Sequence, residues 1–130
     1  MTAIRIGVIS PIDLAFPTVG AAFAELWPEA EPINLLDDSL YADFINDDMT
    51  IPDPMPAEAY DRVAALLRYS RDCGADGVIF CGSVFGLLVE AGREGIDVPV
   101  LTSYEGMIAA AFANGPRLGM LSTTQPTIDC

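Results

Sequence analysis

The stretch Gly77-Val78-Ile79-Phe80-Cys81-Gly82-Ser83-Val84-Phe85-Gly86 decides the fold and holds the strongest candidate for chemistry. Its apolar run, Val78 to Phe80, is typical of a buried strand, and an apolar pattern with helical spacing follows Ser83. In an open parallel sheet, ligands bind just beyond the carboxyl ends of the strands. The sequence therefore predicts that a thiol, a glycine backbone and a hydroxyl are presented together at that edge of a sheet.

Strand-like and helix-like patterns alternate on both sides of this stretch. Predicted strands cover residues 4–9, 31–36, 98–101 and 117–121, and a short helix with a long loop is predicted over residues 41–56. The longest predicted helix begins at Pro56 or Ala57 and ends at Gly74. This alternation predicts an α/β fold, a flavodoxin-like doubly wound parallel sheet of four to five strands with helices on both faces. The expected strand order is 2-1-3-4 or 2-1-3-4-5, with the strand that contains Pro32 at an edge.

The composition limits the function. The chain has 130 residues, 19 of them acidic and 6 basic, for a net charge of −13. A nucleic acid or an anionic membrane surface would be repelled, so we expect neither as a partner. There is no His, and there is no Lys because all six basic residues are Arg. This excludes His-dependent nucleophilic sites, the commonest zinc ligands, Schiff-base chemistry and a P-loop lysine. We expect neither a metal nor a cofactor.

Three cysteines, Cys73, Cys81 and Cys130, have neither a metal-binding nor a CxxC spacing. A disulfide framework is not indicated, so we expect a cytoplasmic location. Cys73 falls in the last turn of the longest predicted helix and is interpreted as structural. Cys81 ends a strand before a predicted helix, whose N-terminus would lower the pKa of the thiol. Without a neighbouring His, a thiolate can act as a base toward a carbon acid; the alternative is a small buried residue.

Small polar residues follow four of the predicted strands: Ser10, Cys81-Gly82-Ser83, Thr102-Ser103 and Ser122-Thr123-Thr124. Hydroxyls and free N–H groups in such places bind carboxylates or phosphates, which predicts an anion-binding crevice. The alternative is that these residues only cap helices and form turns. A phosphoryl-receiver domain is excluded because it needs a lysine, and a dinucleotide site because residues 10–15 contain no glycine.

Residues 78–83 resemble the strand–Cys–x–Thr/Ser motif of the aspartate/glutamate/hydantoin racemase superfamily, which also includes maleate isomerases and arylmalonate decarboxylases. Ile6 to Ile9 and Leu118 to Thr123 are similar to the opening strands of that superfamily's two lobes. The resemblance implies a cofactor-independent isomerase that transfers a proton at the carbon next to a carboxylate of a small amino acid or dicarboxylate. It also implies a first racemase-like α/β lobe over residues 1–115 and the start of a second, truncated lobe over residues 116–130.

The resemblance further implies roles for individual residues. In the racemases of this superfamily two cysteines face each other across a cleft between the lobes, and Cys81 would be the catalytic cysteine of the first lobe. Some relatives carry that cysteine one place later, where this chain has Gly82. The second cysteine normally stands much further along the chain than Cys130, which is not taken as the partner. The implied substrate-binding residues, which would hold carboxylates through N–H and O–H groups, are Ser10, Gly82, Ser83, Thr123 and Thr124.

A second interpretation gives the thiol no chemical role. A single lobe with an anion-binding edge and half of a catalytic pair could be a non-catalytic or inactive α/β module that binds a small acid or oligomerises. A lone first lobe would also expose the surface that normally meets its second lobe. We therefore expect a homo-oligomer under either interpretation.

Overall fold

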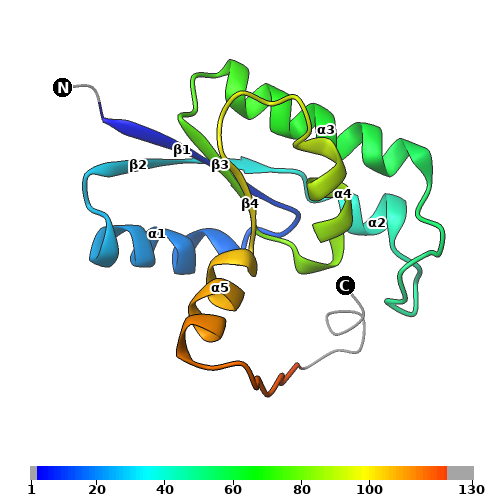
Figure 1. Cartoon of the computed structure of the whole chain (residues 1–130). Helices are drawn as coiled ribbons and strands as arrows, with labels where there is room; N and C mark the ends of the chain where they lie inside the picture. Colours follow the sequence, from blue (N-terminus) through cyan, green and yellow to red (C-terminus); the bar gives the residue numbers. More distant parts are fainter. Residues whose placement is uncertain (1–2, 123–130) are drawn as a thin grey trace.

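Four parallel strands form the centre of the structure, a computed structural model that describes residues 3–122 (Figure 1). They are β1 (Ile4–Ser10), β2 (Ala30–Leu36), β3 (Gly77–Phe80) and β4 (Val100–Thr102). The strand order is β2-β1-β3-β4, and each neighbouring pair is parallel. The predicted α/β class and strand order are thus confirmed, and the strand that contains Pro32 is at an edge.

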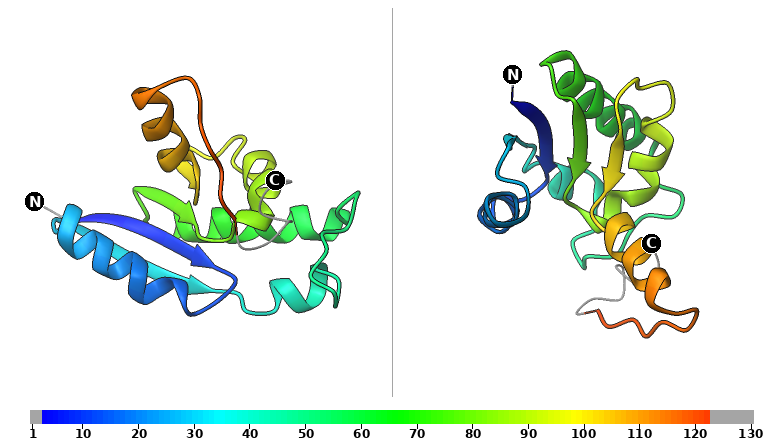
Figure 2. Two further views of the ribbon diagram at one scale, coloured as in Figure 1. Left: turned by 90° about the horizontal axis from the view of Figure 1, so that it is seen from below. Right: turned by 60° about the vertical axis from the view of Figure 1, so that its left-hand side comes forward.

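Helices cover both faces of this sheet. They are α1 (Ala15–Leu26), α2 (Leu40–Phe44), α3 (Ala57–Asp72), α4 (Gly86–Gly92) and α5 (Glu105–Asn114), and a 3-10 turn, η1 (Ser83–Phe85), precedes α4. α3 and α4 pack against one face and against each other, and α1 lies on the other face (Figures 1 and 2). α5 follows β4 and projects away from the sheet (Figure 2). The doubly wound arrangement with helices on both faces is therefore confirmed.

The apolar core lies between the sheet and the helices α3 and α4. Its buried side chains from strands and helices include Ile9, Val78, Phe80, Val100, Val63, Leu67, Leu88 and Val89. Because side chains alternate along a strand, the neighbours of these strand residues point to the other face. There Ile79 is half-buried and Leu101 is 47% exposed. One face of the sheet is thus closely packed, and the other is only partly covered.

Gly7 lets α3 come close to the central strand β1. A Cβ atom at this position would lie 1.9 Å from Ser70 Oγ and 3.2 Å from Ser70 Cβ of α3, so a larger residue fits only if Ser70 shifts. The buried side of α3 consists of Ala59, Val63, Leu67 and Ser70, as its apolar periodicity predicts. The close contact between α3 and β1 positions the carboxyl end of β1 relative to the helix.

The segment after β2 contains α2 and then residues 45–56, which form neither helix nor strand. This agrees with the short helix and long loop predicted over residues 41–56. Leu40 is fully buried, and the ring of Tyr41 packs edge-on against Phe85, with 5.5 Å between the ring centroids. α2 is therefore anchored to the turn that follows β3.

The fifth strand predicted over residues 117–121 is not formed. Residues 115–122 contain no strand, and Leu118, Met120 and Leu121 are 46%, 67% and 101% exposed. A strand needs a hydrogen-bonded neighbour, and α5 carries the chain away from β4 before this segment begins. Thr123, Thr124 and Cys130 lie outside the described residues. None of the helices within residues 3–122 combines the length and apolar character needed to cross a membrane.

Candidate active site at the carboxyl edge of the sheet

Cys81 comes directly after β3, at the carboxyl edge of the sheet. Its N–H donates a 2.7 Å hydrogen bond to the carbonyl of Ile9, which continues the pairing of β3 with β1. Its own carbonyl accepts a 3.3 Å hydrogen bond from Ser10 Oγ. The half-buried thiol is therefore held at a defined place beside the end of β1.

Ser10, the last residue of β1, is fully buried. Its hydroxyl donates to the carbonyl of Ile12 at 2.7 Å as well as to that of Cys81, and it accepts from the N–H of Ile12 at 3.2 Å. Its carbonyl accepts from the N–H of Asp37 at 3.0 Å, just after β2. Ser10 thus joins the carboxyl ends of three neighbouring strands.

Gly82 lies between two rings. Its backbone is extended, with φ −161° and ψ 94°. A Cβ atom here would lie 2.9 Å from Cγ of Pro11 and 3.1 Å from Cε1 of Phe80, and Phe80 is only 1% exposed. Neither ring can move aside at low cost, because a packed interior resists added volume. Position 82 thus has no room for a cysteine side chain, and the space for a thiol in this chain is at position 81.

Ser83 is half-buried and begins η1, a turn closed by a 3.1 Å hydrogen bond from the N–H of Phe85 to the carbonyl of Gly82. The turn separates Cys81 from α4, so the thiol does not sit at the N-terminus of an α-helix. Burial raises the pKa of the Cys81 thiol above its ordinary value. The expectation that a helix N-terminus lowers this pKa is therefore wrong, because desolvation disfavours the thiolate.

At the end of β4, polar groups of Thr102 donate hydrogen bonds to Glu105, the first residue of α5. Thr102 is 3% exposed, and its N–H and hydroxyl donate to Glu105 Oε2 at 2.6 and 3.1 Å. Arg93 Nη1 donates to Glu105 Oε1 at 2.7 Å. Burial would raise the pKa of Glu105, but these hydrogen bonds hold it below its ordinary value. Thr102 is therefore buried and hydrogen-bonded to Glu105, and it does not face an open crevice.

Four of the predicted site residues come together at this edge: Ser10, Cys81, Gly82 and Ser83. The other two, Thr123 and Thr124, lie outside the described residues. Cys73, interpreted as structural, directly follows α3 and is exposed. Within residues 3–122, no three side chains of His, Cys, Asp or Glu form a group that could hold a metal ion. The roles of the predicted site residues stay predictions.

A cavity of about 600 Å³ opens at the carboxyl ends of β1 and β2. It lies beside residues 81–85, which are called the Cys81 turn below. Its walls come from the segment after β1, the end of β2, α2 and the following loop, and they consist of Pro11, Ile12, Asp13, Leu14, Leu36, Asp38, Tyr41 and Met49. Pro11 also packs against Gly82, and Tyr41 also packs against Phe85. The cavity walls therefore touch the Cys81 turn at two points. Sequence reasoning missed this cavity because its outer wall comes from a segment with weak periodicity.

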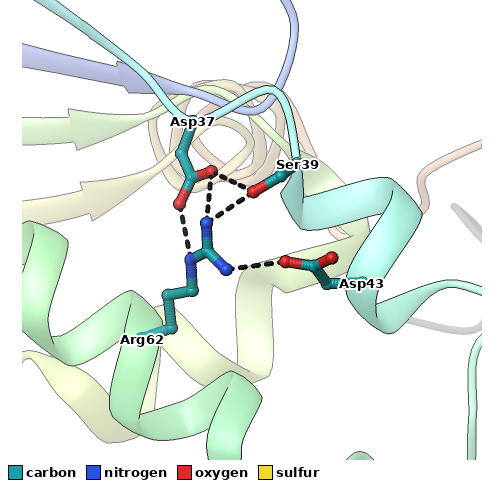
Figure 3. Close-up of polar contacts among 4 residues, drawn as sticks. All are labelled: Asp37, Ser39, Asp43 and Arg62. Carbon is teal, nitrogen blue, oxygen red and sulfur yellow. Dashed lines mark hydrogen bonds and ion pairs between the residues drawn. The ribbon is translucent and has the colours of Figure 1, made fainter.

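A polar network ties α2 and the end of β2 to α3 (Figure 3). Arg62 donates from Nε and Nη2 to the two carboxylate oxygens of Asp37 at 2.8 and 2.9 Å, and from Nη1 to Asp43 at 2.7 Å. The hydroxyl of Ser39 donates to Asp37 at 2.9 Å and accepts from Arg62. Burial would raise the pKa of Asp37, but the hydrogen bonds from Arg62 and Ser39 hold it below its ordinary value. The spacing of apolar residues along α3 concerns that helix alone, so it does not reveal the distant partners of Arg62.

The fold and this edge define a class: a doubly wound α/β lobe that presents a cysteine just after a central strand. The family model for Asp/Glu/Hydantoin racemase matches residues 16–130. This is most of the chain, and the protein belongs to the Asp/Glu/Hydantoin racemase family. The match begins inside α1, so β1 and Ser10 lie before it. A comparison with curated proteins found no match. The resemblance inferred from residues 78–83 is thus confirmed at the level of the family.

Proposed function

We propose that this chain is a cofactor-independent isomerase that uses a thiol to move a proton at the carbon next to the carboxylate of a small amino acid or dicarboxylate. The observation that carries the proposal is the place of Cys81, at the carboxyl edge between the end of β1 and a tight turn. Membership of the racemase family supports the reaction class. Cys81 is the proposed catalytic residue, and the N–H groups of Gly82 and Ser83 with the Ser83 hydroxyl are the proposed carboxylate ligands.

The proposed reaction has two steps. In the first, the Cys81 thiolate takes the α-proton: an S–H bond forms, the Cα–H bond breaks, and its electron pair moves into the carboxylate to give an enediolate. Hydrogen-bond donors at positions 82 and 83 would stabilise the added negative charge. In the second step the enediolate takes a proton from an acid: the acid's bond to hydrogen breaks, a Cα–H bond forms and the carboxylate is restored. Inversion requires that this acid lie on the opposite face, and Cys81 then releases its own proton to solvent. In this proposal residues 116–130 begin a second lobe, from which Thr123 and Thr124 contact the substrate.

In this proposal Ser10 mainly positions the backbone that carries the Cys81 thiol. Its hydroxyl is already bonded to chain atoms of Ile12 and Cys81, and its side chain is buried. It would bind a substrate carboxylate only by exchanging the bond to Ile12 for one to the ligand. Its first role is therefore to hold the backbone on which the thiol sits.

The test is α-proton exchange in D₂O, followed by ¹H NMR with small amino acids and dicarboxylates. Cys81→Ala is expected to abolish the exchange. Cys73→Ala removes an exposed thiol elsewhere and is expected to keep the wild-type rate. Circular dichroism checks that both variants are folded. Exchange at the wild-type rate in Cys81→Ala contradicts the proposal.

A non-catalytic module that binds small acids or self-associates is the second candidate. The observation that favours it is the burial of Cys81, which raises the pKa of the thiol and so leaves little thiolate at neutral pH. Alkylation by iodoacetamide, read for each cysteine by peptide mass spectrometry, separates a catalytic Cys81 from a thiol that no ligand approaches, and α-proton exchange separates it from a module that only binds acids. If Cys81 is catalytic, small carboxylates slow its alkylation and leave that of Cys73 unchanged. A Cys81 rate that no carboxylate alters favours the non-catalytic module.

A further inference from the structure

Two acidic residues are among those that line the cavity beside the Cys81 turn. Its lining residues include Asp13, Asp38 and Tyr41, and the other lining residues are apolar. Both aspartates are exposed, and neither takes part in an ion pair within residues 3–122. A ligand in this cavity would therefore meet uncompensated negative charge.

No side-chain cation lines the cavity. The chain has neither Lys nor His, and all six of its arginines lie in the described part. None of the six is among the lining residues. Arg62, which joins α3 to the neighbouring α2, is occupied by Asp37 and Asp43. A carboxylate entering the cavity would face two like charges without a guanidinium or ammonium to offset them.

Building on the proposed function, we propose that this cavity receives the distal end of the substrate and that this end carries a positive charge. The cavity is close enough to serve the Cys81 site, because Pro11 contacts Gly82 and Tyr41 contacts Phe85. Its apolar walls suit the methylene groups between the reacting carbon and a distal ammonium group. Asp13 and Asp38 are then specificity-determining residues. The substrate class narrows to a monocarboxylate with a distal amine, such as a diamino acid, and a second carboxylate is disfavoured.

The test compares ornithine, glutamine and glutamate, which are similar in length and differ in the charge of the distal group. Affinities come from titrations of the ¹⁵N-labelled chain, with the amides of Asp38 and Tyr41 as reporters. Binding is expected to weaken from ornithine to glutamine to glutamate. Asp13→Asn and Asp38→Asn should each lower the ornithine-to-glutamate affinity ratio by about two- to fivefold, because both sites are exposed. Glu29→Gln makes the same change in charge just before the amino end of β2, whereas the cavity lies at the carboxyl end of that strand. This control variant should leave the ornithine-to-glutamate affinity ratio unchanged.

The outcomes separate this inference from the proposed function. Glutamate binding as tightly as ornithine, or a ratio that neither aspartate variant changes, overturns the inference and leaves Cys81-dependent exchange to stand on its own test. If ornithine binds at this cavity and none of the small amino acids and dicarboxylates shows α-proton exchange, the proposed function is overturned and the charge preference stays intact. Absence of binding by all three ligands overturns the inference, whatever exchange is measured with other carboxylates.

Discussion

Gly82 lies between the rings of Pro11 and Phe80, and these rings limit the size of the side chain that can stand at position 82, next to the thiol. Gly82→Ala would place a methyl group 2.9 Å from Pro11 Cγ, so we expect it to lower the free energy of unfolding by about 1–3 kcal/mol. Gly20→Ala is the matched control. Gly20 lies inside α1, where an added Cβ would meet no atom within 4 Å apart from its chain neighbours and the backbone of its own helix, and alanine there should stabilise the chain by about 0.5–1 kcal/mol. Urea unfolding followed by circular dichroism measures both, and an unchanged stability of Gly82→Ala contradicts the clash.

The position of the thiol could be predicted from the sequence, but its chemical state could not. Val78 to Phe80 predicts a buried strand, so Cys81 had to lie at the carboxyl edge, as it does. The pKa of the thiol depends on the atoms that cover it, and these come from other parts of the chain. The 3-10 turn at Ser83 also displaced the helix whose N-terminus was expected to favour the thiolate. Local patterns thus located the residue, whereas its solvation is a tertiary property.

Among the elements, α2 depends on an arginine of α3. Arg62→Met leaves the carboxylates of Asp37 and Asp43 unpaired, and we expect a loss of about 1–2 kcal/mol of stability, limited by the exposure of the pair. Arg68→Met, on the same helix, removes an exposed arginine that forms no ion pair within residues 3–122 and should change stability little. Chemical unfolding of both variants gives the comparison.

The loss in Arg62→Met should depend on pH in a defined direction. The pKa of Asp37 in the folded chain is lowered, so its contribution is fully present above its unfolded pKa, about 3.9. That contribution is lost as the pH falls through the lower folded value. The stability difference between wild type and Arg62→Met should therefore be full at pH 7 and shrink in acid. A difference that is constant down to acidic pH would mean that Arg62 acts through packing alone.

Elements whose signals are local were predicted well, and those that depend on distant partners were not. Pro32 indicated an edge strand, and α3 ends at Asp72, two residues before Gly74, whose positive φ of 86° is as expected for the glycine that follows a helix C-cap. The apolar pattern of residues 117–121 resembles a strand, but it has no neighbour to pair with in the described chain. The contacts of Arg62 join three segments that only the folded chain brings together. The same holds for the candidate site: the local pattern located the turn at Cys81, but the adjacent cavity, which distant segments form, was missed.

At the scale of the whole molecule, the exposed apolar surface and the net charge have opposite effects on the association of identical chains. The side chains of Met107, Ile108 and Phe112 on α5 are 69%, 37% and 57% exposed, and Leu101 of the nearby β4 is 47% exposed. Exposed apolar side chains on neighbouring elements favour association. The net charge of −13 favours separation of two identical chains. Which effect dominates depends on ionic strength, because salt screens repulsion between exposed charges and leaves apolar contact in place.

We therefore expect the chain to self-associate through the α5 region, more strongly in high salt than in low salt. Sedimentation velocity over a range of protein concentrations at low and high salt measures this. Phe112→Glu places a charge on the exposed side of α5 and should weaken association several-fold, since an unpaired carboxylate resists burial. Leu26→Glu makes the same change in charge on α1, at a side chain that is 79% exposed, and should leave association nearly unchanged. A monomer at every concentration and salt level would show that the charge keeps this apolar surface apart and that the expected homo-oligomer does not form.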